Sequence, residues 1–412
     1  RRIPIIADEA VDPPIGTAAL KITPAHDPTD FEVAERHDLP LLNVMNHDAT
    51  MNENAGPYKG LERLACRDKV VADLRDKGLL EKVEPYLHSV GHCNRCLTMV
   101  EPRVSRQWFI RTKPLAERAI EVVKQGRVTI IPERFTKVYF DWMENIKDWC
   151  ISRQLWWGHR IPVWYCQDCG ELTASVDKPL VCAYCKSKQI IQDPDVLDTW
   201  FSSALWPHST LGWPEDTDDL RYFYPSSVME TGYDILFFWV ARMIMMGLED
   251  TGEIPFHTVY LHGLIRDESG EKMSKLRGNV INPTEAVNEY GVDALRFALI
   301  MGSSPGNDIS LGGGKLKSGR NFVNKLWNTA RFIFRNMDTA EIESLTGSQE
   351  IARKIEDRWI SSQLNRLIQD VSGLMEDFQF GEASQRIYDF IWSKFCDWYI
   401  EIAKVRLRNN RA

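Results

Sequence analysis

The stretch "TVYLHGLIRDESGEKMSKLRGNVINP", Thr258 to Pro283, decides how the rest of the chain is interpreted. It begins as an apolar strand with a glycine turn and continues as a loop in which Lys272 and Lys275 flank a Met-Ser pair. Lysine carries a compact charge that suits phosphate oxygens. A solvated basic turn is the alternative meaning of two nearby lysines, so the surroundings of the loop decide between the two.

Those surroundings indicate an α/β sheet. "SSVMETG", residues 226–232, predicts a strand, the apolar run 234–247 predicts a buried helix, and residues 258–264 predict a second strand. The turns after the two strands are Thr231–Asp234 and His262–Gly263. Ligands of open α/β sheets bind beyond the carboxyl ends of the strands, where these turns lie. After the loop, residues 284–299 predict one further helix.

The flanking regions have other patterns. Residues 1–92 predict short strands, Gly/Pro turns and a helix within 60–80, and the chain from about residue 315 is helical. Two apolar stripes there predict the core faces of a helix bundle: Ile360, Leu364, Leu367, Val371, Leu374 and Phe378, then Ala383, Ile387, Phe390, Trp398, Ile402 and Val405.

Composition limits the classes of protein. The 412 residues predict two to four structural units, and 44% hydrophobic residues with 14 Trp are enough for sizeable cores. A net charge of −8 argues against nucleic-acid binding by the whole surface but allows a local basic tract. The most apolar stretch is short and contains Arg242, so no membrane span is predicted. Without a signal peptide or an initiating Met, the sequence is expected to begin inside a larger protein.

The cysteines predict a metal site. Cys166 and Cys169, and then Cys182 and Cys185, form two C-x-x-C knuckles separated by a 12-residue loop. Four thiolates at this spacing close a structural zinc site in a reducing compartment. Four buried reduced thiols are the alternative. Cys66, Cys150 and Cys396 are single and are interpreted as core residues.

A further knuckle, Cys93 and Cys96, has no second pair in the chain. His88 and His92 are candidates to complete it. The favoured interpretation is half of a site whose other half lies outside these residues.

With these motifs in place, a family resemblance is visible. "KMSKL" with "GNVINP" is similar to the second signature of class I aminoacyl-tRNA synthetases. Together with "DVLDTWFSSALWPHSTLGWPE" and "TGYDILFFWVARMIMMG", the stretch resembles the valyl-tRNA synthetases of that class over nearly the whole chain. Leu276-Arg277 departs from the Ser-Lys that the family often has.

The resemblance implies an α/β chain with the second half of a Rossmann-like catalytic domain, part of a β-rich editing domain, a zinc ribbon and a helical anticodon-binding bundle. The implied boundaries are 1–92 for the partial editing domain, 93–165 for the return into the catalytic domain, 166–186 for the zinc ribbon, 187–314 for the catalytic domain with its lysine loop, and 315–412 for the start of the anticodon-binding domain.

The implied activity is ATP-dependent activation of valine and its transfer to tRNA(Val) in the cytoplasm, with ATP, Mg²⁺ and Zn²⁺. Lys272 and Lys275 would stabilise the departing phosphates. Resemblance places the ATP or adenylate near Gly232, Asp234, His262, Gly263, Met273 and Ser274, and the valine side chain between Trp200, Ile235 and Trp239. From periodicity alone, these last three would be plain core residues.

"GTAALKITPAHDPTDFEVAERH", residues 16–37, predicts a strand, a Pro turn and a helix capped by Asp27 before Pro28. The resemblance adds a hydrolytic site for mischarged threonyl-tRNA(Val), because an apolar pocket cannot strongly reject threonine. Its residues would be Lys21, Thr23, Asp27 and Asp30, with Asp30 anchoring the amino group. Ile15 stands where an aromatic is common, and a Thr-rich strand would precede residue 1.

Two alternatives stay open. An isoleucyl-tRNA synthetase is the rival within the class, although "ITPAHDP" favours the valyl enzymes. A non-catalytic, zinc-containing RNA-binding protein is the rival outside it, because the first class signature, His-x-Gly-His, does not occur. That signature is expected upstream, in a full-length monomer without membrane attachment. Residues 1–412 alone are therefore expected to perform no valine-dependent ATP–pyrophosphate exchange.

Overall fold

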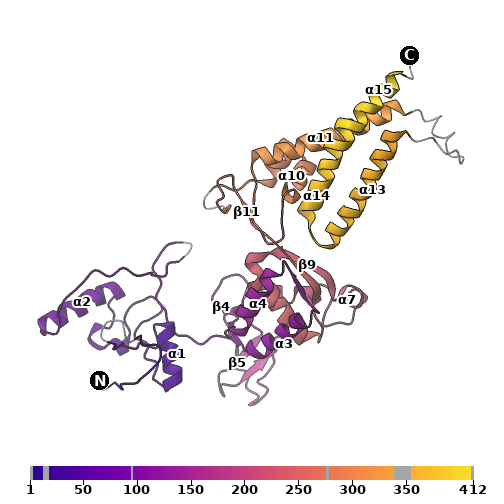
Figure 1. The fold of residues 1–412 in the computed structure, drawn as a ribbon. Helices are drawn as coiled ribbons and strands as arrows, with labels where there is room; N and C mark the ends of the chain where they lie inside the picture. The colour runs from indigo at the N-terminus through magenta and orange to yellow at the C-terminus, as the bar shows by residue number, and fades with distance from the viewer. Residues whose placement is uncertain (1–2, 13–17, 94–95, 275–277, 338–353, 410–412) are drawn as a thin grey trace. The chain divides into compact units, whose positions relative to one another are not determined.

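The computed structural model describes residues 3–12, 18–93, 96–274, 278–337 and 354–409. The chain divides into two compact units, Arg1–Gln107 and Trp108–Ala412. Figure 1 shows the order of the elements along both units. The division predicted between residues 92 and 93 falls inside the first unit, in the segment that leads up to Gln107.

Three helices make up the regular structure of the first unit within its described residues: α1 (Pro28–His37), the 3-10 helix η1 (Glu53–Tyr58) and α2 (Arg63–Asp76). Helix α1 begins as predicted. The Asp27 carboxylate accepts the N–H groups of Thr29 at 2.8 Å and Asp30 at 3.0 Å, and Pro28 occupies the first turn. Helix α2 confirms the helix predicted within residues 60–80.

The short strands predicted for residues 1–92 are not formed in the described part of that segment. Isolated antiparallel bridges take their place, at Met45↔Met51, Thr50↔Glu62 and His92↔Met99. Side-chain oxygens between residues 43 and 54 hydrogen-bond backbone N–H groups two residues further on, as Asp48 does to Thr50 at 3.0 Å. Such local turns compete with strand pairing, which explains why the segment stays irregular.

The second unit contains a parallel three-stranded sheet in the order β2 (Thr129–Ile131), β10 (Phe256–His262), β9 (Ser226–Gly232). Strands β9 and β10 confirm the two strands that the sequence predicts, and their register pairs His262 with Gly232. Because the strands run in the same direction, their carboxyl ends lie at one edge of the sheet. Among the described residues β9 pairs only with β10, so its other side is an open edge.

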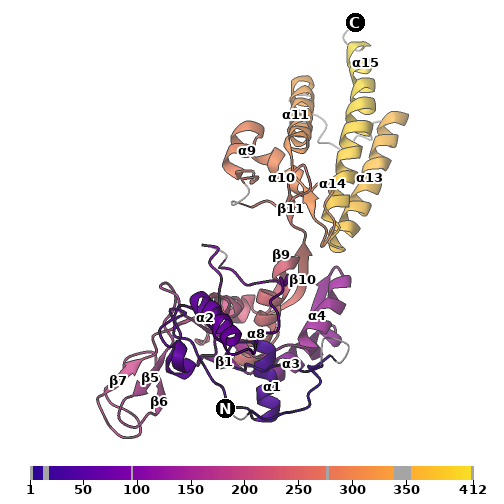
Figure 2. The ribbon, with the colours of Figure 1, turned by 90° about the vertical axis from the view of Figure 1, so that its left-hand side faces the viewer.

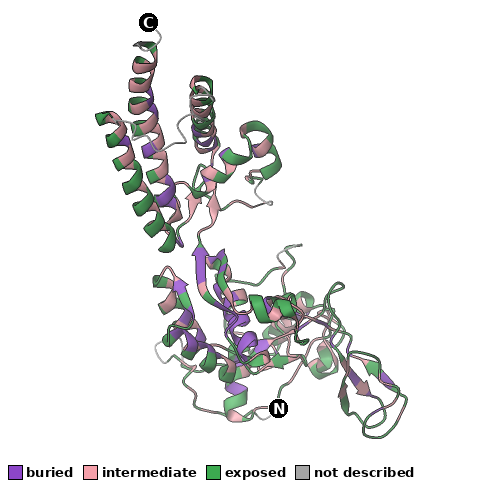
Figure 3. Ribbon diagram, turned by 90° about the vertical axis from the view of Figure 1, so that its right-hand side faces the viewer, coloured by how far each residue is buried: buried purple, intermediate pink, exposed green. Residues whose placement is uncertain are grey.

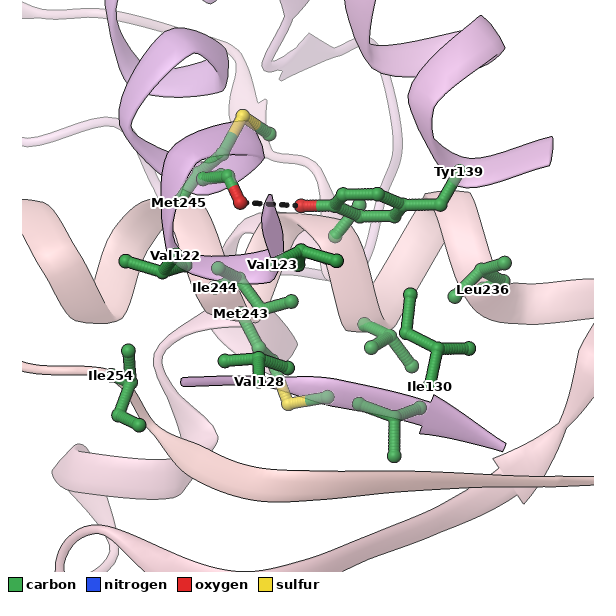
Figure 4. Close-up of a cluster of buried hydrophobic side chains, with 14 of the residues drawn as sticks. Val122, Val123, Val128, Ile130, Tyr139, Leu236, Met243, Ile244, Met245 and Ile254 are labelled. Atoms are coloured by element: carbon green, nitrogen blue, oxygen red, sulfur yellow. Dashed lines mark hydrogen bonds between the residues drawn. The ribbon is translucent and has the colours of Figure 1, made fainter. Parts of the chain in front are cut away.

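Helices α3 (Lys113–Lys124), α4 (Arg134–Glu144) and α8 (Arg242–Asp250) share the largest hydrophobic core with the sheet. Figure 4 shows Tyr139 in this core, where its hydroxyl donates to the Ala119 carbonyl at 3.2 Å and burial raises the pKa of the phenol. Met243, Ile244 and Met245 are fully buried beside it. Each such side chain contributes about 1.5–3 kcal/mol by burial.

The helix predicted over residues 234–247 is present in three consecutive pieces. The 3-10 turn η2 (Tyr233–Ile235) leads into the π-helical η3 (Leu236–Ala241), and α8 follows. A π-helical turn is wider than an α-helical one, and such turns are frequent at functional sites.

Shorter elements complete the region between the sheet and residue 312. They are the pairs β1 (Phe109–Ile110) with β3 (Trp149–Cys150), β4 (Ser152–Arg153) with β8 (Val196–Leu197) and β11 (Ile265–Arg266) with β12 (Ile309–Ser310), the sheet β6 (Leu172–Ala174)–β5 (Val163–Cys166)–β7 (Ile190–Gln192), and the helices α5 (Thr199–Ala204), α6 (Trp206–Ser209) and α7 (Asp218–Phe223).

Residues 283–300 form two helices, α9 (Pro283–Tyr290) and α10 (Val292–Ile300), where the sequence predicts one. The prediction is wrong because Gly291 ends the first helix. This residue has φ 92° and ψ 154°, which glycine adopts without strain, and its N–H donates to the Val287 carbonyl at 2.9 Å.

The C-terminal helices confirm the predicted bundle. They are α11 (Gly313–Asn336), α13 (Ile355–Glu376), α14 (Phe380–Asp389), the π-helical η4 (Phe390–Ile400) and α15 (Glu401–Asn409). Figure 2 shows α13 beside the continuous rod of α14, η4 and α15. None of the helices in the described ranges combines the length and apolarity needed to cross a bilayer.

The predicted stripes are buried only in part. Ile360, Ala383 and Phe390 are buried, whereas Trp398 is 66% and Val405 57% exposed. The prediction of a core position is wrong for Trp398 and Val405 and also for Leu364 on α13, which is 44% exposed, because these side chains face solvent in the described part of the chain. Figure 3 shows the same contrast, with buried residues gathered around the sheet and the C-terminal helices mostly half-buried or exposed.

Gly291→Ala should destabilise the α9–α10 region by about 1 kcal/mol or more, because a Cβ penalises its left-handed φ although nothing lies within 4 Å of it. Gly373→Ala is the matched control, since its Cβ also meets nothing within 4 Å but its φ is not positive. That change should stabilise α13 by about 0.5–1 kcal/mol. Hydrogen exchange of peptides covering 283–300 and 355–376 measures both effects, and slower exchange over 283–300 in Gly291→Ala would contradict the assignment.

Candidate functional site

The carboxyl ends of β9 and β10 bring together four of the residues predicted to hold an adenylate. Gly232 is paired with His262, whose Nδ1 lies 2.7 Å from the Gly263 carbonyl oxygen. A Cβ on Gly232 would lie 2.8 Å from the Asp234 carboxylate and 3.5 Å from the His262 ring, so the absence of a side chain there keeps the cluster open. Glu230, which the sequence did not single out, adds a carboxylate 3.3 Å from His262 Nε2.

The lysine loop reaches the same edge. Lys272 Nζ lies 3.7 Å from Asp234 Oδ2. Both side chains are more than a third exposed, and a pair of this kind contributes about 0–1 kcal/mol, so the contact shows where the lysine reaches without anchoring the loop. Lys275, Leu276 and Arg277 lie outside the described residues.

Two polar residues at the ends of the loop anchor it. Asp267 Oδ1 accepts the N–H groups of Ser269 at 3.0 Å and Glu271 at 2.8 Å, and its Oδ2 accepts from the Asn279 amide at 2.8 Å. Asn279 in turn accepts the N–H of Ser274 at 2.8 Å. The Ser269 hydroxyl and the Asn279 amide lower the pKa of Asp267 to about 2.

The sequence alone did not predict that Asp267 and Asn279 hold the two ends of the loop together. Asp267 opens the stretch Asp-Glu-Ser-Gly, residues 267–270, which is a turn signal that predicts its local hydrogen bonds. The bond to Asn279 depends on the closure of the loop and has no local signal.

Gly263 has a structural reason to be glycine. A Cβ there would lie 1.8 Å from the Asn307 carbonyl oxygen, so the backbone of residues 307–308 passes directly against it. The neighbouring Asp308 accepts the N–H of Leu264 at 2.8 Å and pairs with the Arg266 guanidinium. This contact positions the turn after β10 whether or not a ligand is bound.

Met273 and Ser274, both predicted to lie near ATP, occupy the inner side of the loop. The Met273 side chain packs against the small core of Ala286, Ala298 and Leu316, and the Ser274 N–H is held by Asn279. Their observed contacts therefore anchor the loop between the two lysines.

The two tryptophans predicted to wall an amino-acid pocket lie on neighbouring elements, Trp200 on α5 and Trp239 on η3. The Trp239 indole donates to the Ser203 carbonyl on α5 at 3.0 Å. Trp239 also lines a mainly apolar cavity of about 430 Å³ along the open edge of β9. Trp200 and Ile235 do not line this cavity, although Ile235 lies one helical turn from Trp239.

The four cysteines of the predicted ribbon form one cluster. Their sulfur atoms all lie within 4.8 Å of one another, with Cys166 and Cys185 3.5 Å apart and Cys169 and Cys182 3.7 Å apart. Four sulfurs about 2.3 Å from a tetrahedral zinc ion would be about 3.8 Å apart, so the donor set fits zinc. Backbone N–H groups of Cys169 and Asp168 lower the pKa of the Cys166 thiol to about 6, which favours the thiolate that binds metal.

All three C-x-x-C pairs share the same two backbone hydrogen bonds. The backbone N–H of the first cysteine donates to the carbonyl oxygen of the residue five positions later. The residue after the second cysteine has a positive φ, and its N–H donates to the carbonyl oxygen of the first cysteine. That residue is Gly170, Lys186 and, in the pair Cys93–Cys96, Leu97 with φ 60°. Within the described residues, only the four-cysteine cluster gathers three or more metal-ligating side chains, so His88 and His92 do not complete a site with Cys93 and Cys96.

Two of the predicted editing residues are in contact. The buried Asp30 accepts through Oδ2 both the N–H of Thr23 at 2.6 Å and its hydroxyl at 3.0 Å. Asp27 caps the helix that carries Asp30, and Lys21 is exposed. Ile15 lies outside the described residues.

Comparison with known proteins gives matches over most of the chain. A family model described as tRNA synthetases class I (I, L, M and V) matches residues 22–312, and one described as the anticodon-binding domain of tRNA ligase matches residues 357–412. Proteins named valine–tRNA ligase are 62% identical over 409 residues in Dehalococcoides mccartyi, 57% over 409 residues in Symbiobacterium thermophilum and 52% over 408 residues in Thermotoga maritima.

These alignments cover 99% of this chain but 45–47% of the relatives, so the chain spans about half the length of the curated relatives it matches. Solved structures agree on the fold. Mycobacterium tuberculosis methionyl-tRNA synthetase matches with a TM-score of 0.54 and 20% identity over 72% of this chain and 53% of that one. An Agrobacterium radiobacter LeuRS matches with a TM-score of 0.50 and 24% identity over 60% of this chain and 37% of that one.

The matched model covers the lysine loop, both strand ends and the four clustered cysteines, and the fold agrees with solved synthetases. The chain belongs to the class I tRNA synthetases of the I, L, M and V group.

Proposed function

We propose that the protein containing this chain is a valine–tRNA ligase, which activates valine with ATP and transfers it to tRNA(Val). The observation that carries the proposal is the meeting of Lys272, Asp234 and His262 at the carboxyl ends of β9 and β10. The choice of valine follows from relatives with that name at 52–62% identity, and an isoleucyl enzyme is the rival that an amino-acid panel would separate.

The geometry suits adenylate formation. A valine carboxylate oxygen attacks the α-phosphorus of ATP, and the bond from that phosphorus to the bridging oxygen breaks, so that pyrophosphate leaves. The charges of Lys272 and Lys275 would stabilise the departing phosphates, which Mg²⁺ accompanies. The Asp234 carboxylate would accept hydrogen bonds from the ribose hydroxyls beside Gly232, and His262 and Gly263 would lie next to the adenine.

The valine side chain is assigned to the region between Trp200, Ile235 and Trp239. The two indoles belong to elements joined by the Trp239–Ser203 hydrogen bond, which supports a fixed apolar wall. A wall of this kind rejects larger side chains but not threonine. The same reasoning supports a separate hydrolytic site in residues 1–92.

In that site Asp30 is the proposed anchor for the amino group of the mischarged threonine. Its Oδ2 is held by Thr23, and its Oδ1 has no hydrogen bond among the described residues, so one carboxylate oxygen can accept from an ammonium. Lys21 and Asp27 are the further proposed members.

The ribbon of residues 166–186 is assigned a structural zinc ion held by Cys166, Cys169, Cys182 and Cys185. A closed four-thiolate site leaves no position for a substrate, so the metal would hold β5–β7 together and take no part in the reaction.

Cys166→Ser should abolish zinc binding, because one lost thiolate opens the tetrahedral set. Elemental analysis should find one zinc per chain in the unmodified protein and in Cys150→Ser, whose half-buried cysteine lies outside the cluster. One zinc per chain retained in Cys166→Ser would contradict the assignment.

Lys272→Met and Lys275→Met should each slow valine-dependent ATP–pyrophosphate exchange by about 100-fold in the full-length enzyme, because each removes charge stabilisation at the leaving phosphates. The dissociation constant of valine, measured by equilibrium binding, should change less than about threefold. Lys325→Met is the control, since that lysine pairs with Asp397 on the helical bundle. An equal loss of valine binding and exchange would instead indicate a misfolded site.

Asp30→Asn should slow hydrolysis of threonyl-tRNA(Val) at least about tenfold and leave valine activation intact. An asparagine oxygen still accepts from Thr23, so the change removes mainly the charge that holds the ammonium. Asp38→Asn is the matched control at the other end of α1, where the residue has φ 51° and asparagine is well tolerated. Undiminished clearance of threonyl-tRNA by Asp30→Asn would sink the editing assignment.

A further inference from the structure

A buried charged cluster lies behind the tryptophans and is used by neither reaction. We call it the Asp198–Arg242 cluster; it comprises Asp198, Arg242, Arg153 and Trp149. Asp198 is 5% exposed and precedes α5. Its Oδ2 accepts from the Trp149 indole at 3.0 Å and from Arg153 at 2.9 Å, and its Oδ1 accepts the N–H of Trp200 at 3.3 Å.

Arg242 supplies a second cation to the cluster. It is 9% exposed at the start of α8, in a run of residues that is otherwise apolar. Its guanidinium lies 3.8 Å from the centre of the Trp149 ring, and its Nη1 is 3.7 Å from Asp198 Oδ2. That nitrogen is buried without a hydrogen bond among the described residues, and burial lowers the pKa of Arg242 to about 10, so the group remains cationic at neutral pH.

Stability does not explain this arrangement. A buried ion pair is often no more stabilising than apolar side chains of the same volume, and its best-attested use is to fix the register of the elements that carry it. Here the elements are α5 and α8, and Met243 to Met246 show that α8 can bury apolar side chains throughout.

The cluster connects directly to the proposed pocket. Asp198 holds the first turn of α5 through the N–H of Trp200, while Trp239 holds the last turn through the Ser203 carbonyl. Phe238 lies between the cluster and the pocket: its ring centre is 5.6 Å from the Arg242 guanidinium and 6.0 Å from the centre of the Trp200 ring. Helix α5 is therefore fixed at both ends against η3 and α8.

We infer that the Asp198–Arg242 cluster is a positioning device that sets the side-chain size limit of the amino-acid pocket by fixing Trp200 relative to Trp239. The inference rests on the proposed function. An apolar pocket discriminates against one extra methylene by a factor of about 10 to 200 in kcat/KM. That factor requires the side chains that wall the pocket to keep their positions when a larger side chain enters. Asp198 and Arg242 act through the tryptophans and need not touch the amino acid.

The test uses the full-length enzyme and ATP–pyrophosphate exchange with valine and isoleucine, which differ by one methylene. Arg242→Met keeps the length and apolar stem but removes the charge, and Asp198→Asn keeps the cap of α5 but leaves two arginines uncompensated. In each variant the preference for valine, as a ratio of kcat/KM, should fall at least about fivefold. KM for valine should rise about tenfold while kcat stays within about twofold.

Arg242→Lys should restore part of the preference, because it returns a cation to the same place. Arg118→Met is the matched control. That arginine binds Glu249 and the Leu248 carbonyl at the far end of α8, away from α5, and its loss should leave the preference unchanged.

An unchanged preference in both folded variants, or an equal loss of kcat/KM for valine and isoleucine, would overturn the inference. Circular dichroism verifies folding, and if Arg242→Met does not fold, Asp198→Asn decides by the same criteria. Failure of the unmodified enzyme to activate valine would overturn the proposed function itself, and is thereby distinguished from a defect of the cluster.

Discussion

The register of β9 against β10 is the constraint on which the candidate site depends. Pairing of Gly232 with His262 ends the two strands at one level, so that the turns after them emerge side by side. Asp234 then stands within reach of Lys272, although Asp234 directly follows β9 and Lys272 comes only after β10 and β11. A slip of one residue would turn every side chain of one strand to the opposite face and would separate Glu230 from His262.

Several residues at these sites have a structural role that explains why their residue type is needed there, even without a ligand. Asp27 caps α1, Gly263 makes room for the backbone at residues 307–308, and Met273 fills the core beneath the loop. Lys272 and Asp234 differ, because their exposed pairing contributes little stability. An exposed charge pair at the carboxyl ends of β9 and β10 is therefore the part of the site that packing does not explain.

The sequence was sufficient for features with local signals. Strands β9 and β10, the cap of α1 and the cysteine knuckles follow from periodicity, capping chemistry and spacing. It failed where a competing interaction prevailed: Gly291 interrupted an otherwise helical pattern, and local turns replaced the strands expected before residue 93. Exposure of Trp398 and the bond between Asp267 and Asn279 depend on which segments meet in space, and a single sequence does not encode that directly.

The close approach at Gly263 has a genetic consequence. Any side chain at that position collides with the Asn307 carbonyl, and relief requires the backbone around Asp308 to move away. Asp308 also holds Leu264 and Arg266, so such a movement would be transmitted to the base of the lysine loop. No single replacement at residue 263 is neutral on this basis. Selection for suppressors of a Gly263 mutant should therefore return second-site changes among residues 304–308. Mutations in that segment would then show a genetic interaction with mutations in the turn after β10.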